Sequence, residues 1–209
     1  MKALIIVDMQ NDFMEGGALP VPGGKELIPF LGKLIGRFEL VVATQDWHPA
    51  NHASFAANHP GRQIGDIIDH GGQPQVLWPV HCVQNTPGAE FVRFWTKNVF
   101  QKGIDPEIDS YSGFFDNGKR RATGLGDFLK EQLVDQVYIT GVATDYCVKF
   151  TALDAKALGF GTNVIVDACR GVNLQPGDAD QALYEMRQAG IFTTYFENIP
   201  DFNSFTYQK

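Results

Sequence analysis

The sequence lacks the features that mark membrane, secreted and nucleic-acid-binding proteins. No stretch approaches the roughly 18 apolar residues of a membrane span, and the apolar run at residues 4–7 is too short for a signal peptide and ends at Asp8. The chain has 17 Lys and Arg against 24 Asp and Glu, a net charge of −7, and no basic run beyond residues 119–121. These absences predict a cytoplasmic protein with neither a nucleic-acid nor a membrane partner.

Cysteine is also scarce, and the sequence contains no repeat, low-complexity tract or linker. The three cysteines, Cys82, Cys147 and Cys169, are odd in number and widely spaced, so we expect no disulfide framework. Each thiol must then be core filler, a metal ligand or a nucleophile. A length of 209 residues, of which 44% are hydrophobic, predicts one folded domain over residues 1–209. The oligomeric state stays open, and a homo-oligomer is compatible with the sequence.

Short apolar runs alternate with helix-like segments along the chain. We expect strands at residues 4–7, 40–43, 98–101, 136–140, 163–166 and 191–194, and helices at 26–38, 126–134, 145–158 and 178–188. This alternation predicts an α/β fold with a doubly wound sheet of about six mostly parallel strands and helices on both faces. The section from about 46 to 90 exceeds an ordinary loop and is expected to be a functional insertion.

Chemically active side chains follow four of the expected strands. Asp8 follows the first strand, Asp46 and His48 the second, and Lys102 the third, while the segment 141–147 follows the fourth. Ligands of open α/β sheets bind beyond the carboxyl ends of the strands. An acid at a strand end is often only a helix cap, and a lysine there is usually solvated. Their joint placement nevertheless predicts a site at this edge.

Cys147 is the favoured nucleophile. We expect it in the first turn of the helix after the fourth strand, with Thr144 as the N-cap. A helix start and the ammonium of Lys102 would favour the thiolate, and Asp8 could accept the thiol proton. The plain alternative is a buried structural thiol. Cys169 ranks second because no helix start accompanies it, and Cys82 beside His81 is a ligand or packing.

All five histidines fall within the insertion: His48, His52, His59, His70 and His81. On an extended segment, Asp46 and His48 point the same way. One Asp with two His is an acceptable ligand set for Zn²⁺, Mn²⁺ or Fe²⁺. The clustering favours a metal site over solvated loop histidines, but the pattern does not choose the third ligand. Nearby aromatic residues predict either core packing or a flat slot for a ring: Phe13, Trp47, Trp78 and Phe100.

Over nearly its whole length the chain resembles the nicotinamidases of the isochorismatase-like cysteine hydrolase superfamily. The resemblance rests on residues 6–13, 44–49, 78–82, 102–103 and 141–148. It implies that Cys147 attacks an amide carbon, that Asp8 passes the thiol proton to departing ammonia, and that Lys102 stabilises the anionic partners. It also implies a cis peptide between Val142 and Ala143, and an oxyanion hole built from the N–H groups of Ala143 and Cys147.

The same resemblance implies a cofactor and a substrate. Asp46, His48 and His81 match the ligands of one divalent metal ion, Zn, Fe or Mn, which would hold a pyridine nitrogen. The residues that match substrate contacts are Phe13, Trp78, Val142 and Ala143. The implied reaction converts the small-molecule amide nicotinamide to nicotinate and ammonia in NAD salvage, with pyrazinamide as a second substrate. His52 is left open as a ligand, a neighbour of the ligands, or neither.

Three other readings remain. A relative that cleaves another amide or carbamoyl group would keep Asp8, Lys102 and Cys147 but generally lack the metal. A hydrolase in which metal-bound water attacks would make Cys147 a bystander. A binding module on the same sheet would release no ammonia, but it would have no need for the acid, amine and thiol together.

Overall fold

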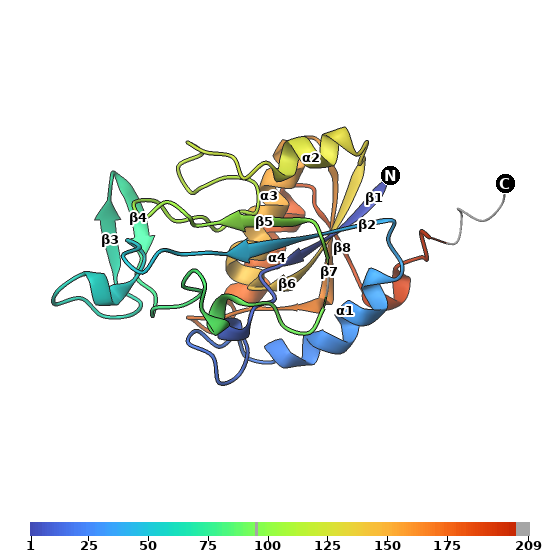
Figure 1. Ribbon diagram of the computed structural model, residues 1–209. Helices are drawn as coiled ribbons and strands as arrows, with labels where there is room; N and C mark the ends of the chain where they lie inside the picture. The colour runs from blue at the N-terminus through green and yellow to red at the C-terminus, as the bar shows by residue number, and fades with distance from the viewer. Residues whose placement is uncertain (95, 204–209) are drawn as a thin grey trace.

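The fold is built on a six-stranded sheet with strand order β5-β2-β1-β6-β7-β8. The computed structural model describes residues 1–94 and 96–203 (Figure 1). The strands are β1 Lys2–Val7, β2 Leu40–Asp46, β5 Val99–Lys102, β6 Gln136–Val142, β7 Gly161–Arg170 and β8 Phe192–Thr194. Every pairing in this sheet is parallel. The predicted fold class is therefore confirmed.

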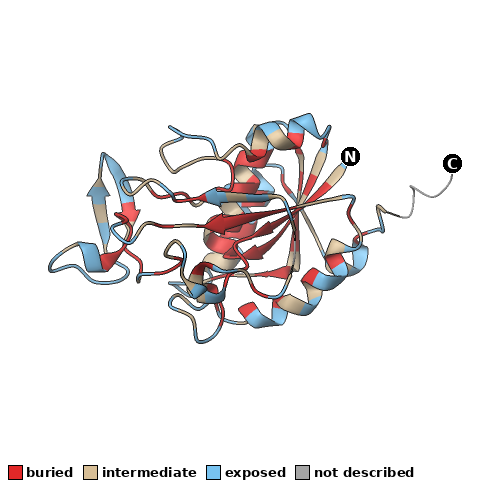
Figure 2. Cartoon of the chain, viewed as in Figure 1, coloured by how far each residue is buried: buried red, intermediate tan, exposed pale blue. Residues whose placement is uncertain are grey.

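Helices cover both faces of the sheet. On β1, Ala3, Ile5 and Val7 belong to a core cluster shared with α2 (Leu125–Glu131), α3 (Lys149–Ala157) and α4 (Asp178–Gln188). Leu4 and Ile6 belong to the cluster on the other face, with α1 (Ile28–Ile35). Figure 2 shows the central strands buried between these layers. Both faces of these strands are occupied by apolar side chains. Polar groups are therefore expected at the ends of the strands.

Several boundaries differ from the sequence predictions. The helix expected at 26–38 is a 3-10 turn, η2 Gly24–Leu27, followed by the shorter α1, which has Pro29 in its first turn. The strand expected at 163–166 is the ten-residue β7. β8 and α4 lie within one residue of the prediction. Turn residues at helix ends carry little apolar periodicity, so the pattern located the elements better than their limits.

The long section between β2 and β5 contains an antiparallel hairpin that the sequence reading missed. It pairs β3 (Ile67–His70) with β4 (Gln73–Val76), between the 3-10 turns η3 (Ala56–Asn58) and η4 (Pro87–Ala89). In Figure 1 this hairpin lies beyond the carboxyl ends of β2 and β5. Two further 3-10 turns among the described residues are η1 (Asn11–Phe13) and η6 (Phe196–Asn198). The hairpin of the insertion thus lies at the same edge of the sheet as the predicted site.

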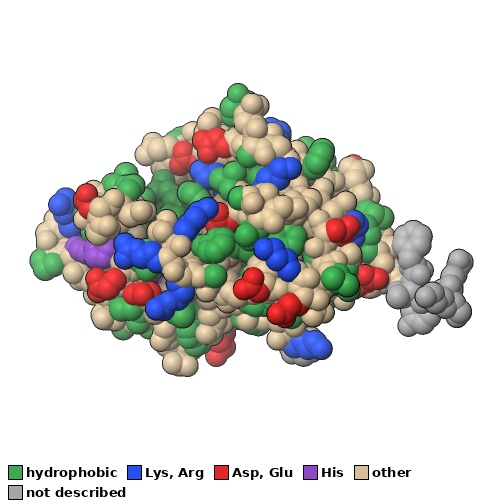
Figure 3. Space-filling model, turned by 90° about the horizontal axis from the view of Figure 1, so that it is seen from above, with side chains coloured by type: hydrophobic (Ala, Val, Ile, Leu, Met, Phe, Trp, Pro, Cys, Tyr) green, Lys and Arg blue, Asp and Glu red, His purple; other side chains and the backbone are tan. Residues whose placement is uncertain are grey.

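The face of the molecule seen in Figure 3 carries charges of both signs. In the view of Figure 3, acidic and basic side chains are interspersed over the visible face. None of the helices in the described part of the chain is long and apolar enough to cross a membrane.

Candidate active site and metal centre

The carboxyl ends of three neighbouring strands bring acids and an amine together. Asp8 directly follows β1, Asp46 ends β2 and Lys102 ends β5. Asp46 and Lys102 are partners in the β2–β5 register, so adjacent strands present them side by side. The side chain of Gln10 fixes the backbone of Asp46, accepting its N–H at 2.8 Å and donating to its carbonyl at 2.8 Å. The register of the sheet and the Gln10 hydrogen bonds therefore fix the positions of these residues.

Lys102 is the centre of this cluster. Its ammonium lies 2.9 Å from Asp8 Oδ2 and also pairs with Asp46 Oδ1. It donates to the carbonyl oxygen of Ser110 at 2.8 Å and lies 3.4 Å from Cys147 Sγ. The residue is only 1% exposed. Burying an ammonium and two carboxylates has a large unfavourable desolvation free energy. Packing alone would not require such a cluster, so the arrangement favours a chemical role.

Cys147 lies in a π-helical turn, η5 Thr144–Val148, that precedes α3. The prediction of Thr144 as N-cap is wrong: the cap is Ala143, whose carbonyl accepts the N–H groups of Tyr146 and Val148, so the turn already includes Thr144. The peptide between Val142 and Ala143 is cis, as the resemblance implied. This turn presents the thiol to Lys102 from the end of β6.

Burial dominates the pKa values of the Cys147 thiol and of Asp8, but not that of Asp46. Burial raises the pKa of Cys147 well above its usual value, against the opposing effect of Lys102. The Lys102 ammonium thus acts in the direction expected from the sequence, towards the thiolate, while burial acts against it. Burial also raises the pKa of Asp8, which makes its carboxylate a better proton acceptor. For Asp46, burial is outweighed by Lys102 and His48, and its pKa lies well below the usual range.

Lys102 itself stays charged. Burial alone would lower the pKa of its ammonium, but the carboxylates of Asp46 and Asp8 outweigh it and hold that pKa well above the usual value. Asp8 Oδ1 is occupied by the hydroxyl of Thr44 at 2.6 Å. Its Oδ2 makes an ion pair but no well-directed hydrogen bond within the described chain. Of the two carboxylate oxygens of Asp8, Oδ2 is thus the one without a hydroxyl donor, and it faces the Lys102 ammonium.

Asp46, His48 and His81 form a candidate metal centre. His48 Nε2 and His81 Nε2 lie 3.4 and 3.6 Å from the same oxygen, Asp46 Oδ2. The Nδ1 atoms face the backbone carbonyls of Gly103 at 2.9 Å and Pro79 at 2.8 Å. Such carbonyls fix the tautomer that leaves the Nε2 lone pair for a metal. Donor type, convergence and orientation all fit one divalent cation.

The other three histidines differ. His52 packs its ring 4.1 Å from that of His48, and burial together with His48 lowers its pKa to about 4. His59 Nε2 lies 2.7 Å from the carbonyl oxygen of Ala53, and His70 Nε2 lies 3.6 Å from Glu107 Oε2. Neither His59 nor His70 belongs to a ligand group found among the described residues.

A pocket opens above Cys147 and the candidate metal centre, with about 380 Å³ of empty space, part of it open to solvent. It is lined by Phe13, Leu19, Asp46, His48, Trp78, His81, Asp109, Tyr111, Ala143, Tyr146, Cys147 and Val172. The indole N–H of Trp78 donates to the Tyr111 hydroxyl at 3.2 Å, and the Tyr146 ring stands edge-on to Trp78 at 4.9 Å. The lining thus combines aromatic rings with carboxylate, imidazole and thiol side chains, a combination that suits a small flat ligand.

Comparison with known proteins places the chain in a family. Residues 2–196 match the isochorismatase domain. The chain is 50% identical to the nicotinamidase of Escherichia coli K12 over 197 residues, 90% of this chain and 92% of the relative. The chain belongs to the isochorismatase family. That family consists of cysteine hydrolases, so a thiol at the strand-end site agrees with its chemistry.

Two solved structures of this isochorismatase family support the same assignment. An Acinetobacter baumanii nicotinamidase/pyrazinamidase aligns with a TM-score of 0.91 and 46% identity, covering 94% of this chain and 97% of that one. A Pyrococcus horikoshii pyrazinamidase in complex with zinc aligns with a TM-score of 0.77 and 44% identity, covering 93% and 98%.

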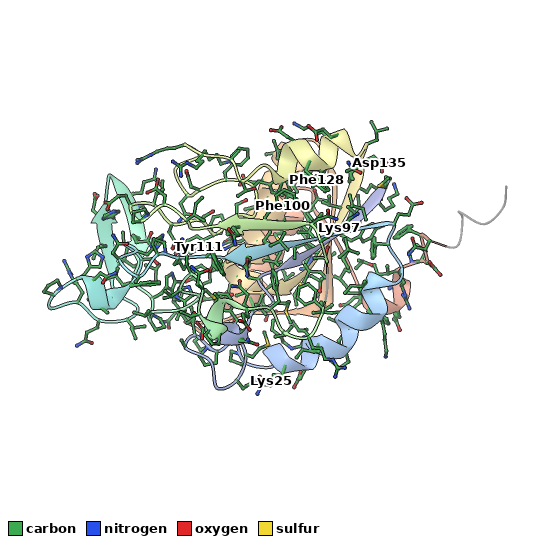
Figure 4. The ribbon with its side chains drawn as sticks, in the orientation of Figure 1. Lys25, Lys97, Phe100, Tyr111, Phe128 and Asp135 are labelled. Carbon is green, nitrogen blue, oxygen red and sulfur yellow. The ribbon has the colours of Figure 1, made fainter. Side chains whose placement is uncertain are left out.

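Several sequence candidates of this isochorismatase-family chain lie away from the pocket. Trp47 and Phe100 are not among the described lining residues. Trp47 packs against the core on the α1 face, and Phe100 packs on Phe128 of α2 at 5.3 Å, as Figure 4 shows. Val142 is 1% exposed within the core and is not among the described lining residues. The slot predicted from four aromatic residues therefore uses Phe13 and Trp78 only.

The rival cysteines are buried elsewhere. Cys169 lies inside β7 rather than after it, with its thiol 3.9 Å from the carbonyl of Ile139, and burial raises its pKa to about 12. Cys82 is fully buried in the core on the α1 face. Cys147 is the cysteine found among the described lining residues.

Sequence reasoning also missed residues of the pocket wall. Asp109, Tyr111 and Val172 come from irregular segments that carry no periodic signal. Leu19 lies in the turn region after η1. Only Tyr146 had a usable signal, because it directly precedes Cys147 in the segment expected to form the site.

Proposed function

We propose that this chain is a metal-assisted cysteine amidohydrolase that converts nicotinamide to nicotinate and ammonia. The observation that carries the proposal is the buried Lys102 ammonium, 3.4 Å from Cys147 Sγ and 2.9 Å from Asp8 Oδ2. A thiol, an acid and a cation at this spacing are the parts that nucleophilic attack on an amide requires. Relatives named nicotinamidase at 50% and 44% identity support the choice of amide.

In the proposed reaction Cys147 Sγ bonds to the carboxamide carbon as the thiol proton moves to Asp8. Asp8 then gives this proton to the nitrogen, the carbon–nitrogen bond breaks and ammonia leaves a thioester. Water next adds to the thioester, and its cleavage releases nicotinate and restores the thiol. Lys102 remains charged throughout and stabilises the carboxylate and thiolate partners. One proton of the water restores the Cys147 thiol, and the other leaves the site, where ammonia takes it up as ammonium.

In the tetrahedral intermediate, the negatively charged oxygen of the former amide requires hydrogen-bond donors. We assign this role to the N–H groups of Ala143 and Cys147, both of which line the pocket. Ala143 is the N-cap of the π-helical turn that contains Cys147. They belong to one short segment, so the nucleophile and the oxyanion donors are positioned together.

Asp46, His48 and His81 would hold one divalent cation, Zn, Fe or Mn. When bound, the ion supplies a Lewis-acid contact for a ring nitrogen and so orients the substrate. Phe13 and Trp78, which both line the pocket, supply apolar contact for the ring. Pyrazinamide carries a nitrogen at the same ring position, so we expect it to be a substrate too.

Ammonia release from nicotinamide by the purified protein tests the proposal, before and after chelation and metal return. Release that falls on chelation and recovers with metal is the expected result. Absence of release from metal-loaded protein would contradict it and direct attention to carbamoyl or ureido substrates.

Two matched variants separate a thiol nucleophile from a metal-bound water. Cys147→Ala should abolish release with metal content unchanged, whereas Cys169→Ala removes an equally buried thiol from the neighbouring strand and should retain turnover. Residual activity above a few per cent in Cys147→Ala would favour the metal-bound water instead. A role in NAD salvage, a cytoplasmic location, a homo-oligomeric state and a single domain with a metal-site insertion at about 46–90 stay predictions.

A further inference from the structure

The proposed reaction makes no use of His52, a fully buried histidine beside the metal centre. Its ring lies 4.1 Å from the His48 ring at an interplanar angle of 37°. Its Nε2 has no hydrogen-bond partner within the described residues. A buried polar nitrogen without a partner is costly, so it invites the question of whether His52 also binds the metal.

The distances alone permit a second ligand group. His48, His52 and Asp109 offer ligand atoms that all lie within 4.8 Å of one another. Because His48 Nδ1 faces the carbonyl of Gly103, only its Nε2 is available, and that atom already faces Asp46. The two groups would therefore compete for one nitrogen.

Asp109 is already engaged by other donors. Its Oδ1 accepts the backbone N–H of Ser110 at 2.7 Å, and its Oδ2 accepts the side-chain amide of Gln75 at 3.1 Å. These bonds orient the carboxylate without help from a cation.

The surroundings of His52 Nδ1 decide between the roles. The backbone N–H of Ser54 donates to Nδ1 at 3.2 Å, and Ser54 Oγ lies 2.7 Å from the same atom. A backbone N–H can only donate, so Nδ1 is an acceptor and the neutral ring carries its hydrogen on Nε2. This is the reverse of His48 and His81, whose Nδ1 atoms face carbonyl oxygens. Nε2 of His52 thus lacks the lone pair that a metal requires.

The loop around His52 is fastened to the segment that follows Lys102. The N–H of Ala53 donates to the carbonyl of Pro106 at 2.7 Å. The His52 ring is therefore held by Ser54 at Nδ1 and by the His48 ring against its face.

We propose that His52 is a positioning residue in its Nε2–H tautomer, which packs against the metal ligand His48 and does not bind the metal. The inference rests on the proposed metal centre at Asp46, His48 and His81. It gives the insertion a second function: the loop that supplies His48 also supplies the wall that fixes its ring.

Long-range ¹H–¹⁵N correlation spectra of ¹⁵N-histidine-labelled protein at neutral pH test the inference. In metal-free protein we expect the Nε2–H pattern for His52, and an Nδ1–H pattern would overturn the proposal. On adding Zn²⁺, the Nε2 signals of His48 and His81 should shift while the His52 tautomer stays the same. A zinc-dependent change of His52 to Nδ1–H with a shifted Nε2 would identify it as a ligand and refute the inference.

The same spectra separate the two proposals. If Zn²⁺ shifts neither His48 nor His81, the metal centre is wrong, whereas the metal-free tautomer of His52 is read independently of it. Zinc affinity gives a second measure through His52→Gln, which keeps a donor near the Nε2 position, and His48→Gln as the matched control. We expect a loss below about tenfold for His52→Gln and above about a hundredfold for His48→Gln. Equal losses would overturn the inference.

Discussion

Two clusters of charge lie at opposite ends of the sheet, and each places one charge between two of the opposite sign. At the amino end, Asp135 accepts from the terminal amine and from Lys2, both at 3.0 Å. At the carboxyl end, Lys102 lies between Asp8 and Asp46. In Figure 4, Asp135 and the pocket residue Tyr111 mark these two ends.

The clusters differ in their exposure to water. The Asp135 side chain is 61% exposed, whereas those of Asp8 and Lys102 are fully buried. Water screens the first cluster, so its ion pairs contribute little to the free energy of unfolding. In the second, desolvation raises the pKa of Asp8 and Cys147, and the charges hold Lys102 as an ammonium. The same pattern of charges thus serves as a surface contact in one place and supports chemistry in the other.

Removal of the central cation should give the largest effect. Lys102→Met leaves two buried carboxylates without their partner and should lower the free energy of unfolding of the metal-free protein by about 3–5 kcal/mol, measured by urea denaturation. Turnover should be lost as well. Lys2→Met at the exposed cluster is the matched control, with an expected loss below about 1 kcal/mol. Equal losses in the two variants would remove the distinction between the clusters.

Removal of a metal ligand should give an intermediate effect. His48→Ala or His81→Ala should lower zinc content and raise the KM for nicotinamide together, because the same ion is proposed to orient the ring. Metal analysis of dialysed protein alongside steady-state kinetics measures both. Unchanged metal content in both variants would disprove the site.

Neutralisation of Asp135 should give the smallest effect. Hydrogen bonds from the terminal amine and from Lys2 lower its pKa from 3.8 to about 2. A depressed pKa stabilises the fold above pH 3.8, and this contribution is lost as the pH falls towards 2. Asp135→Asn should therefore cost less than about 1 kcal/mol at neutral pH. Urea denaturation at several pH values between 2 and 4 gives the free energy of unfolding against pH. Its slope should be smaller in Asp135→Asn than in the parent, and an identical slope would contradict the assignment.

The strand-end residues could be predicted because regularity carries them. Asp8 and Lys102 lie at the ends of short apolar runs, and a parallel sheet must bring such ends to one edge. The third metal ligand could not be chosen from spacing, because His81 reaches Asp46 through an irregular segment. Its selection needed the resemblance.

The remaining misses have local causes. The β3–β4 hairpin has short, exposed strands without clean alternation, although Gly71-Gly72 between them was a usable signal for a two-residue turn. The π-helical turn around Cys147 depends on which N–H groups Ala143 accepts, and no periodicity encodes that choice. The high pKa of Cys147 follows from burial, which sequence position alone does not give.

The central claim is that Cys147 forms a covalent bond to the acyl group of the substrate. Intact-protein mass spectrometry of the enzyme, acid-quenched during turnover of nicotinamide, tests it directly. The account predicts a nicotinoyl adduct that peptide mapping assigns to Cys147 and that is absent from Cys147→Ala. Ammonia release at the parent rate by Cys147→Ala, with no adduct on the parent enzyme, would contradict it.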